Sequence, residues 1–240
     1  MASMDKHWQR LKRSAGRRWR EWRLPRGYAR LGTKYGGWWL DASQVRPDPL
    51  LIDCGLGQDI SFDVEFLARF GGTVIGIDAN PESLEWCRAR CPKGMHIQDR
   101  AFWTRAGATL KFHLPRPQSE LPKGADGVSG SLLESHAYVA GGPSREVSTT
   151  SLEEVLAGMG RQDCDALKLD IEGAEYEVLN DLAARGQLRR CRQVMVEFHH
   201  RHTGYAMADT ERTVAAVLGA GFRLVHVEGR NYSFRRGDLG

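Results

Sequence analysis

The chain has 240 residues, of which 41% are hydrophobic and 27% are charged, which is typical of a soluble globular protein. This length suits one well-buried α/β domain with an appendage and is short for two full domains. No apolar run approaches the roughly 18–20 residues that a membrane span needs, and the N-terminus is too basic for a secretory signal. The five scattered cysteines indicate reduced thiols and a cytoplasmic location.

The net charge of +4 is unevenly distributed along the chain. Residues 1–30 carry a charge of +8, which leaves −4 for the remainder. Residues 5–23 are predicted to form an amphipathic helix, because three tryptophans and a leucine recur there at three- and four-residue steps. This arm could pack on the domain, which is the preferred interpretation. It could instead lie on an anionic membrane surface through residues 1–24, at the inner membrane face, or contact nucleic acid.

Residues 31–240 are predicted to form a single domain, without repeats. The expected strands cover residues 50–54, 73–78, 95–98, 166–170 and 193–198, and the expected helices cover residues 61–70, 81–91, 151–159, 174–184 and 209–220. Residues 223–228 and 232–235 flank a Gly-Arg-Asn turn as a closing hairpin. This order predicts an α/β, Rossmann-like, doubly wound fold with a seven-stranded, mostly parallel sheet and a C-terminal antiparallel hairpin.

Three segments fall outside this alternation. Residues 35–39, Tyr-Gly-Gly-Trp-Trp, could cover a pocket but are expected to pack against the sheet. A hairpin-like section is expected near residues 108–114. Residues 115–145 are rich in Pro, Gly and Ser and are expected to form a long loop, and loops of this length are usually functional lids or disordered.

The first strand ends in Asp53-Cys-Gly55-Leu-Gly57. Glycines at this turn let the backbone approach a bound ligand closely. The dinucleotide pattern Gly-x-Gly-x-x-Gly fails, because Ile60 stands three residues after Gly57. An acid before the glycines would repel phosphate and suits a ligand that carries an ammonium group.

Asp78 ends the second strand, where an acid in doubly wound folds hydrogen-bonds a ribose. A cap for the following helix is the other interpretation of Asp78. Asn80, which precedes Pro81, can fill that role and leave the Asp78 carboxylate available. The sequence therefore predicts that Asp78 binds a ribose.

Four segments together resemble the FkbM family of class I S-adenosylmethionine-dependent methyltransferases. They are Asp53-Cys-Gly-Leu-Gly-Gln-Asp-Ile-Ser61, Gly76-Ile-Asp-Ala-Asn-Pro81, Leu167-Lys-Leu-Asp-Ile-Glu-Gly-Ala-Glu175 and Val196-Glu-Phe-His199. The third segment is the most specific, and the likeness extends from about residue 32 to residue 235. Asp59 stands where the general class often has a third glycine, which is usual for this family.

The resemblance implies a cofactor, an acceptor and roles for several residues. Asp53 with Gly55 and Gly57 would hold the methionine part of S-adenosylmethionine, and Asp99 is a weaker candidate for the adenine amino group. The implied reaction is O-methylation of a small molecule, and a sugar of a glycolipid or glycosylated natural product, including a lipid-linked sugar, is favoured. The rival is a nucleic-acid methyltransferase that uses the basic arm, which the absence of an Asn/Asp-Pro-Pro-aromatic turn disfavours.

The catalytic candidates stand at the ends of the fourth and fifth strands. Asp170 and Glu172 end the fourth strand at the mouth of the expected crevice, and Glu197 and His199 share one face at the end of the fifth. His199 is predicted to be the general base, because histidine titrates near neutral pH. Glu172 could orient His199 or take its place. Glu175 suits a helix N-terminus as well as a functional role.

The same carboxylates and His199 could hold a divalent metal such as magnesium, since they supply hard oxygen ligands. The sequence shows no tighter metal signature. A metal is therefore not favoured, and no residue is assigned to one.

Overall fold

The computed structural model describes residues 27–123, 125 and 127–239. The predicted helix over residues 5–23, and with it the predicted membrane contact, lies outside them. The strands are β1 (Tyr28–Leu31), β2 (Trp38–Asp41), β3 (Leu50–Cys54), β4 (Thr73–Asp78), β5 (Met95–Asp99), β6 (Ala101–Phe102), β7 (Thr109–His113), β8 (Ser144–Thr150), β9 (Cys164–Leu169), β10 (Cys191–Glu197), β11 (Phe222–Glu228) and β12 (Asn231–Arg236). The helices are α2 (Ser61–Phe70), α3 (Pro81–Arg88), α4 (Leu152–Gly158), α5 (Glu175–Ala184) and α6 (Met207–Gly219), with short 3-10 turns at Ala42–Gln44, Gln118–Glu120 and Gln187–Arg190.

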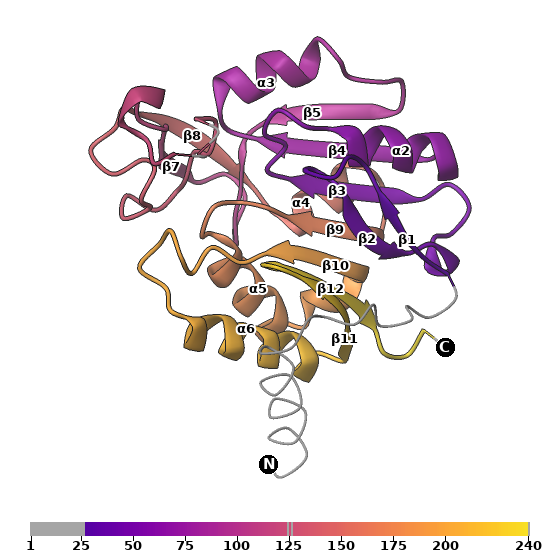
Figure 1. Cartoon of the computed structure of the whole chain (residues 1–240). Helices are drawn as coiled ribbons and strands as arrows, with labels where there is room; N and C mark the ends of the chain where they lie inside the picture. Colours follow the sequence, from indigo (N-terminus) through magenta and orange to yellow (C-terminus); the bar gives the residue numbers. More distant parts are fainter. Residues whose placement is uncertain (1–26, 124, 126, 240) are drawn as a thin grey trace.

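A seven-stranded sheet in the order β11-β12-β10-β9-β3-β4-β5 forms the centre of the fold (Figure 1). Strands β5, β4, β3, β9 and β10 run parallel, and β12 is antiparallel to both β10 and β11. The predicted doubly wound sheet with a closing antiparallel hairpin is therefore confirmed. None of the helices in the described part of the chain has the length and apolar character needed to cross a bilayer.

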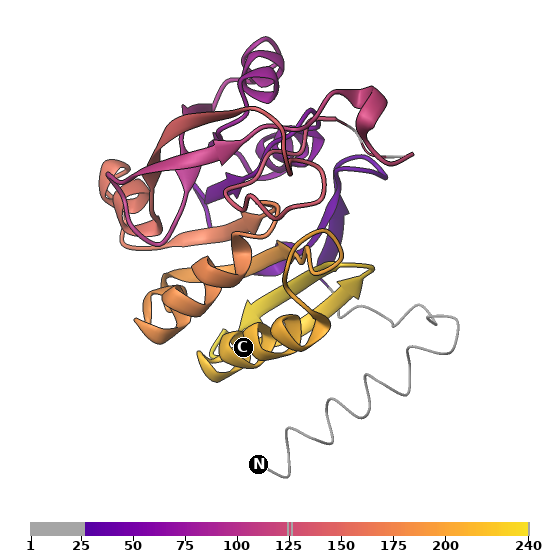
Figure 2. The same ribbon diagram turned by 90° about the vertical axis from the view of Figure 1, so that its left-hand side faces the viewer.

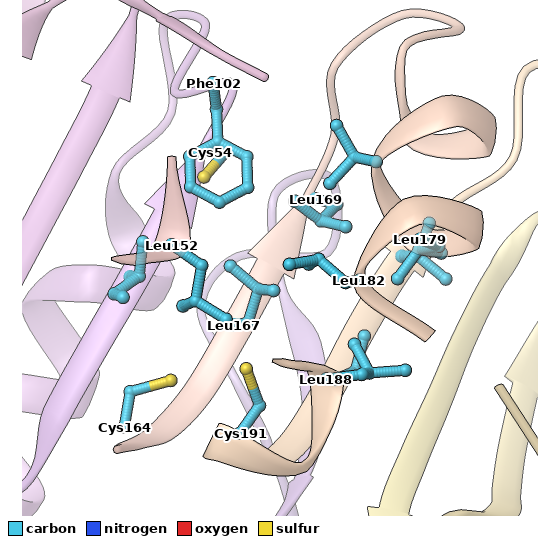
Figure 3. Packing of buried hydrophobic residues seen from close by; sticks show 14 of the residues in the cluster. Cys54, Phe102, Leu152, Cys164, Leu167, Leu169, Leu179, Leu182, Leu188 and Cys191 are labelled. Carbon is cyan, nitrogen blue, oxygen red and sulfur yellow. The ribbon is translucent and has the colours of Figure 1, made fainter. Parts of the chain in front are cut away.

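Both faces of the sheet are covered, which explains why its central strands read as continuous apolar runs. Every residue of β3 is buried. Leu50, Ile52 and Cys54 pack on the face covered by α4, α5 and α6, in the cluster of Figure 3, whereas Leu51 packs on the face covered by α2 and α3. This alternation follows the two-residue period of a strand.

The antiparallel hairpin of β1 and β2 covers the second face beside α2. Trp38 is 3% exposed and packs in the same cluster as α2. The backbone of β2 is fixed to the sheet at Asp41, whose N–H donates to the Gln193 side chain (2.7 Å). The expected packing of residues 35–39 on the sheet is confirmed for Trp38. The predicted boundary between the N-terminal arm and the domain, at residues 30 and 31, falls inside β1.

A smaller sheet, β6-β8-β7, stands beyond the carboxyl ends of β4 and β5 (Figures 1 and 2). The local hairpin predicted near residues 108–114 is wrong, because β7 pairs with β8, which follows the long connection of residues 114–143. Strand β8 was not predicted. Its sequence, Ser-Arg-Glu-Val-Ser-Thr-Thr, has only one large apolar residue and shows little periodicity.

The entry to β3 is fixed by a buried acid on the neighbouring strand. Asp165 of β9 is fully buried and accepts hydrogen bonds from the backbone N–H groups of Arg46 (3.0 Å) and Leu50 (3.1 Å). The Arg46 guanidinium donates to both Asp165 oxygens, at 3.0 and 3.1 Å, and to Asp163. The start of β3 is therefore held in place by the Asp165 carboxylate, whose charge Arg46 neutralises.

Arg46→Ala is expected to lower the free energy of unfolding by about 2–4 kcal/mol, because it leaves the Asp165 charge buried without its cation. Arg161→Ala is the control: Arg161 pairs with Asp48, whose side chain is 74% exposed, and such surface pairs contribute about 0–1 kcal/mol. Urea unfolding measures both. Equal losses in the two variants would show that Asp165 does not depend on Arg46.

Candidate active site

A cavity of about 410 Å³ opens at the carboxyl ends of β3, β4, β9 and β10. Gly55 and Asp78 line one part of it, and Asp170, Glu172 and His199 line another. Parallel strands bring their carboxyl ends to one edge, so residues far apart in the sequence meet there. The structure thus brings together most of the predicted site residues.

The glycine turn passes directly over the end of the neighbouring strand. Gly55 has φ 85°, and a Cβ placed on it would lie 1.7 Å from the backbone oxygen of Asp170. Gly57 has φ 54°, and a Cβ placed there would meet nothing within 4 Å. Gly55 is therefore required by close packing of β3 against β9, whereas Gly57 is required only by its backbone conformation.

Asp78 holds the same turn from the side of β4. Its Oδ2 accepts hydrogen bonds from the N–H groups of Leu56 (2.9 Å) and Gly57 (3.1 Å), and its Oδ1 accepts one from Asn80 (2.8 Å). Asn80 caps α3, as predicted, by accepting from Glu82 N–H. These backbone N–H groups hold the Asp78 carboxylate in place at the wall of the cavity.

Asp53 does not reach the cavity, contrary to its predicted role against an ammonium group. Its buried carboxylate accepts a hydrogen bond from Lys168 Nζ (2.7 Å), and Lys168 also donates to the backbone oxygen of Gly55 (3.0 Å). Residues alternate along a strand, so Asp53 of β3 and Lys168 of β9 face the side of the sheet covered by Trp38. Lys168, not Asp53, lines the cavity.

Asp99 also lies away from the cavity, so the structure does not support its predicted contact with an adenine. Its carboxylate pairs with Arg145 of β8 at 3.3 Å and borders a separate surface depression. The cavity wall at this position is formed instead by Arg100, Ala101 and Phe102. Asp99 is the last residue of β5, and Arg145 of the small sheet neutralises its carboxylate.

His199 is buried against four carboxylates. Its Nε2 lies 3.3 Å from Glu172 Oε2, 3.5 Å from Asp170 Oδ1 and 3.8 Å from Glu197 Oε1. Glu197 also pairs with Arg230 from the turn between β11 and β12. The predicted group of acids and imidazole is therefore assembled, with an added arginine.

Glu175 orients His199 from the opposite side of the ring. Glu175 is fully buried, and its Oε1 accepts from the backbone N–H of His199 (2.8 Å) and lies 3.2 Å from Nδ1. Its Oε2 accepts from Gly173 N–H (2.7 Å). From the sequence, Glu172 could orient His199 or take its place. In the structure Glu175 contacts Nδ1 and the backbone N–H of His199, which leaves Nε2 facing the cavity.

The backbone at Glu172 is held in an uncommon conformation. Glu172 has φ 51°, a region that non-glycine residues seldom adopt, and Gly173 follows with φ 108°. The Ser131 hydroxyl donates to the backbone oxygen of Glu172 (2.7 Å). The long connection between β7 and β8 thus fixes the turn that directs Glu172 into the cavity.

Charge crowding shifts the proton affinities of this group. Burial alone would lower the pKa of His199, but Glu172, Glu175 and Asp170 outweigh it and raise that pKa to about 10. Burial and the Glu197 charge raise the pKa of Asp170 to about 8. Burial opposes ionisation of Glu172, yet His199 and His136 lower its pKa to about 2. The surrounding acids therefore favour the protonated form of His199, which differs from the near-neutral titration expected of a general base.

Two histidines near the cavity were not predicted as site residues. His136, in the connection of residues 114–143, is fully buried, and its Nε2 lies 3.0 Å from Glu172 Oε2. His202 lines the cavity and packs against Tyr138 in a tilted arrangement, with ring centroids 4.8 Å apart. Nothing in the sequence distinguishes His136 within its Pro- and Gly-rich segment, whereas His202 lies within three residues of a predicted site residue.

A Rossmann-like sheet with a cavity at its carboxyl edge is typical of one class of protein. This class comprises α/β enzymes that bind a nucleotide-type cofactor at that edge. Residues 53–224 match the model of the methyltransferase FkbM domain, so the chain belongs to the FkbM methyltransferase family. It is accordingly an S-adenosylmethionine-dependent methyltransferase. No curated protein matches the sequence.

Solved structures with a similar fold are remote relatives. The METTL16 methyltransferase domain has a TM-score of 0.43 and 10% identity, covering 80% of this chain and 60% of that one. Precorrin-6y C5,15-methyltransferase from Geobacter metallireducens has a TM-score of 0.41 and 11% identity, over 80% and 82% of the two chains. Aeropyrum pernix fibrillarin with bound S-adenosyl-L-methionine has a TM-score of 0.41 and 10% identity, over 80% and 66%. Such low values carry no argument about activity.

Gly55→Ala is expected to destabilise the protein more than Gly57→Ala. Both changes force alanine into a left-handed conformation, which costs about 1–2 kcal/mol. Only Gly55→Ala also drives a methyl group into the Asp170 carbonyl, which raises the total above about 3 kcal/mol, as overpacking does. Urea unfolding of the two variants measures the difference. Equal destabilisation would mean that β3 and β9 can separate at this point.

Proposed function

We propose that the protein transfers a methyl group from S-adenosylmethionine to a hydroxyl oxygen of a small polar acceptor, with a sugar as the favoured class. One observation carries the proposal: a single cavity joins the glycine turn and Asp78 to the group of Asp170, Glu172 and His199. One part of the cavity suits a nucleoside with an amino-acid tail, and the other suits a hydroxyl that must lose a proton. When bound, S-adenosylmethionine supplies a methyl group on a positively charged sulfonium.

The residues at the glycine turn fit such a cofactor. Gly55, Gly57 and Asp78 line the cavity, and no atom lies within 4 Å of a Cβ placed on Gly57, so the backbone there is open to a ligand. A carboxylate at the position of Asp78 suits a ribose hydroxyl. The acids at the other end of the cavity suit a cation, because carboxylates in a shielded site stabilise nearby positive charge. No phosphate-binding residues are needed, which agrees with the failure of the dinucleotide pattern.

The acceptor end can position a hydroxyl and hold its proton. Asp170, Glu172 and His199 present oxygen and nitrogen atoms to one point of the cavity, and alignment of two reactants lowers a barrier by about 7–11 kcal/mol at most. Tyr138 and Leu132, from the connection of residues 114–143, form part of the wall and limit the access of water.

The polar character of this end supports a sugar over an apolar acceptor. Arg230, Asn231, His202 and Glu197 line it together with the three central residues, and sugars are recognised through many hydroxyl hydrogen bonds. The charge of +8 on residues 1–30 supports a lipid-linked acceptor at an anionic surface, since each basic residue there contributes on the order of 1 kcal/mol.

Asp78→Asn is expected to weaken the binding of S-adenosylhomocysteine by about 10–150-fold, or about 1.5–3 kcal/mol, because a charged hydrogen bond is lost. The asparagine oxygen can still accept from Leu56 and Gly57, whereas its NH2 group replaces the oxygen that accepts from Asn80. Titration calorimetry measures the affinity. Asp99→Asn is the matched control and should bind like the unaltered protein, because Asp99 lies outside the cavity. Undiminished affinity in Asp78→Asn would remove Asp78 from the cofactor site.

Glu172→Gln and His199→Gln are expected to leave S-adenosylhomocysteine affinity unchanged and to lower turnover by about 10²–10⁴-fold, the usual effect of removing acid–base groups. Turnover is measured as S-adenosylhomocysteine released with a panel of glycosides. Glu177→Gln is the control, because Glu177 is exposed on α5. Full turnover in both cavity variants would place proton acceptance elsewhere. Release with none of the glycosides, but with apolar alcohols, would overturn the sugar assignment.

A further inference from the structure

We propose that Asp170, Glu172 and His199, with His136 beside them, bind a divalent first-row transition-metal ion at the acceptor end of the cavity. One ligand atom from each of the first three residues lies within 4.8 Å of the others. They come from the end of β9, the strained turn after it and the end of β10, so three separate backbone segments converge on one point.

The spacing of the atoms agrees with a coordination sphere. With metal–ligand bonds of about 2.1 Å, adjacent ligand atoms are about 3.0 Å apart in an octahedron and about 3.4 Å apart in a tetrahedron. Nε2 of His199 lies 3.3 Å from Glu172 Oε2 and 3.5 Å from Asp170 Oδ1. Nε2 of His136 lies 3.0 Å from Glu172 Oε2. These separations require only small adjustments to surround one ion.

The orientation of His199 is that of a metal ligand. Histidines that bind metals almost always donate their other ring N–H to a carboxylate or a carbonyl, which fixes the tautomer and the ring. Glu175 Oε1 lies 3.2 Å from Nδ1 of His199, and Glu175 is itself held by two backbone N–H groups. Nε2 is consequently directed at Glu172 and Asp170.

His136 is a second and independent observation. Its side chain is fully buried, and its Nε2 lies 3.0 Å from Glu172 Oε2 without the geometry of a well-formed hydrogen bond. Buried polar atoms without a well-formed hydrogen bond are rare in native proteins. This atom is aimed at Glu172 Oε2, so a cation shared with Glu172 would satisfy it.

The ion pairs of Asp170 and Glu172 are with histidines. Arg230 pairs with Glu197, but no lysine or arginine among the described residues forms an ion pair with Asp170 or Glu172, which pair with His199 and, for Glu172, also with His136. Mixed imidazole and carboxylate ligands favour manganese, iron, cobalt or zinc over the all-oxygen sites of magnesium and calcium.

The location of the proposed metal site indicates which ligand from outside the protein the ion would coordinate. This step rests on the proposed function. The site opens on the cavity, so coordination positions not taken by the protein face the acceptor. A divalent ion lowers the pKa of a bound hydroxyl or water strongly. The ligand class is therefore a hydroxyl, or a pair of neighbouring hydroxyls, presented by the acceptor.

The test measures metal binding by the full chain without cofactor or acceptor. After chelator treatment and dialysis, Mn²⁺ is titrated and free Mn²⁺ is followed by electron paramagnetic resonance, with Zn²⁺ as competitor. We expect one Mn²⁺ per chain, displaced by Zn²⁺. His199→Gln should abolish binding. Glu175→Gln should weaken it by about 10–100-fold, as loss of a partner that orients a metal ligand does.

His200→Gln is the matched control, because the His200 imidazole contacts Thr210 and not the cavity acids. This variant should bind Mn²⁺ like the unaltered protein. Absence of Mn²⁺ and Zn²⁺ binding, or equal binding by His199→Gln and the unaltered chain, would overturn the proposal. S-adenosylhomocysteine calorimetry on the same samples reports folding and the cofactor site separately. Metal binding without methyl transfer to any hydroxyl would reject the proposed function while leaving the metal site in place.

Discussion

The buried ion pair between Lys168 and Asp53 is the interaction on which the cavity depends. It joins the two central strands at their carboxyl ends, with 2.7 Å between Nζ and Oδ1, and its lysine also holds the Gly55 carbonyl. Removal of either partner would leave an unpaired charge beneath the glycine turn, which is far more costly than loss of an exposed pair. The pair also cancels an acid that would otherwise stand close to the cavity.

The two ends of the cavity are built on different physical principles. The glycine turn is held by backbone close packing and by the hydrogen bonds to Asp78, so its shape hardly depends on side-chain choice. The acceptor end concentrates charged side chains, and its geometry depends on Glu175 and on the turn at Glu172. Rigid backbone geometry suits the binding of a cofactor, and charged side chains suit the polar acceptor that we propose.

The sequence was sufficient for the sheet and for the identity of the central residues. Apolar runs that end in an acid, followed by a helical period, predict parallel strands and place Asp78, Asp170 and Glu172 at one edge. It could not show that Asp53 would pair with Lys168, because the two residues lie on different strands, 115 residues apart in the sequence. Nor could it reveal His136, because a loop residue reaches the site only through long-range packing.

Asp99 illustrates the same limit in another way. A position at a strand end predicts proximity to the crevice, but Arg145 of an unpredicted strand draws the side chain outward. Strand β8 itself lacks the apolar alternation that would reveal it, and its pairing with β7 spans the long connection. Pairings of this kind depend on tertiary contacts more than on local propensity.

The connection of residues 114–143 has a consequence for how this scaffold can diversify. It joins β7 to β8 of the small sheet, which is separate from the seven-stranded sheet. It nevertheless contributes part of the cavity wall. Grafting a different connection between β7 and β8 would alter the acceptor end that we propose, while the bonds of Asp78 to the glycine turn come from outside the connection. The contacts that restrict such a graft include a hydroxyl like that of Ser131 for the Glu172 carbonyl and an imidazole like that of His136 beside its carboxylate. A grafted loop that lacks either contact would leave Glu172 without one of the groups that hold it in the cavity.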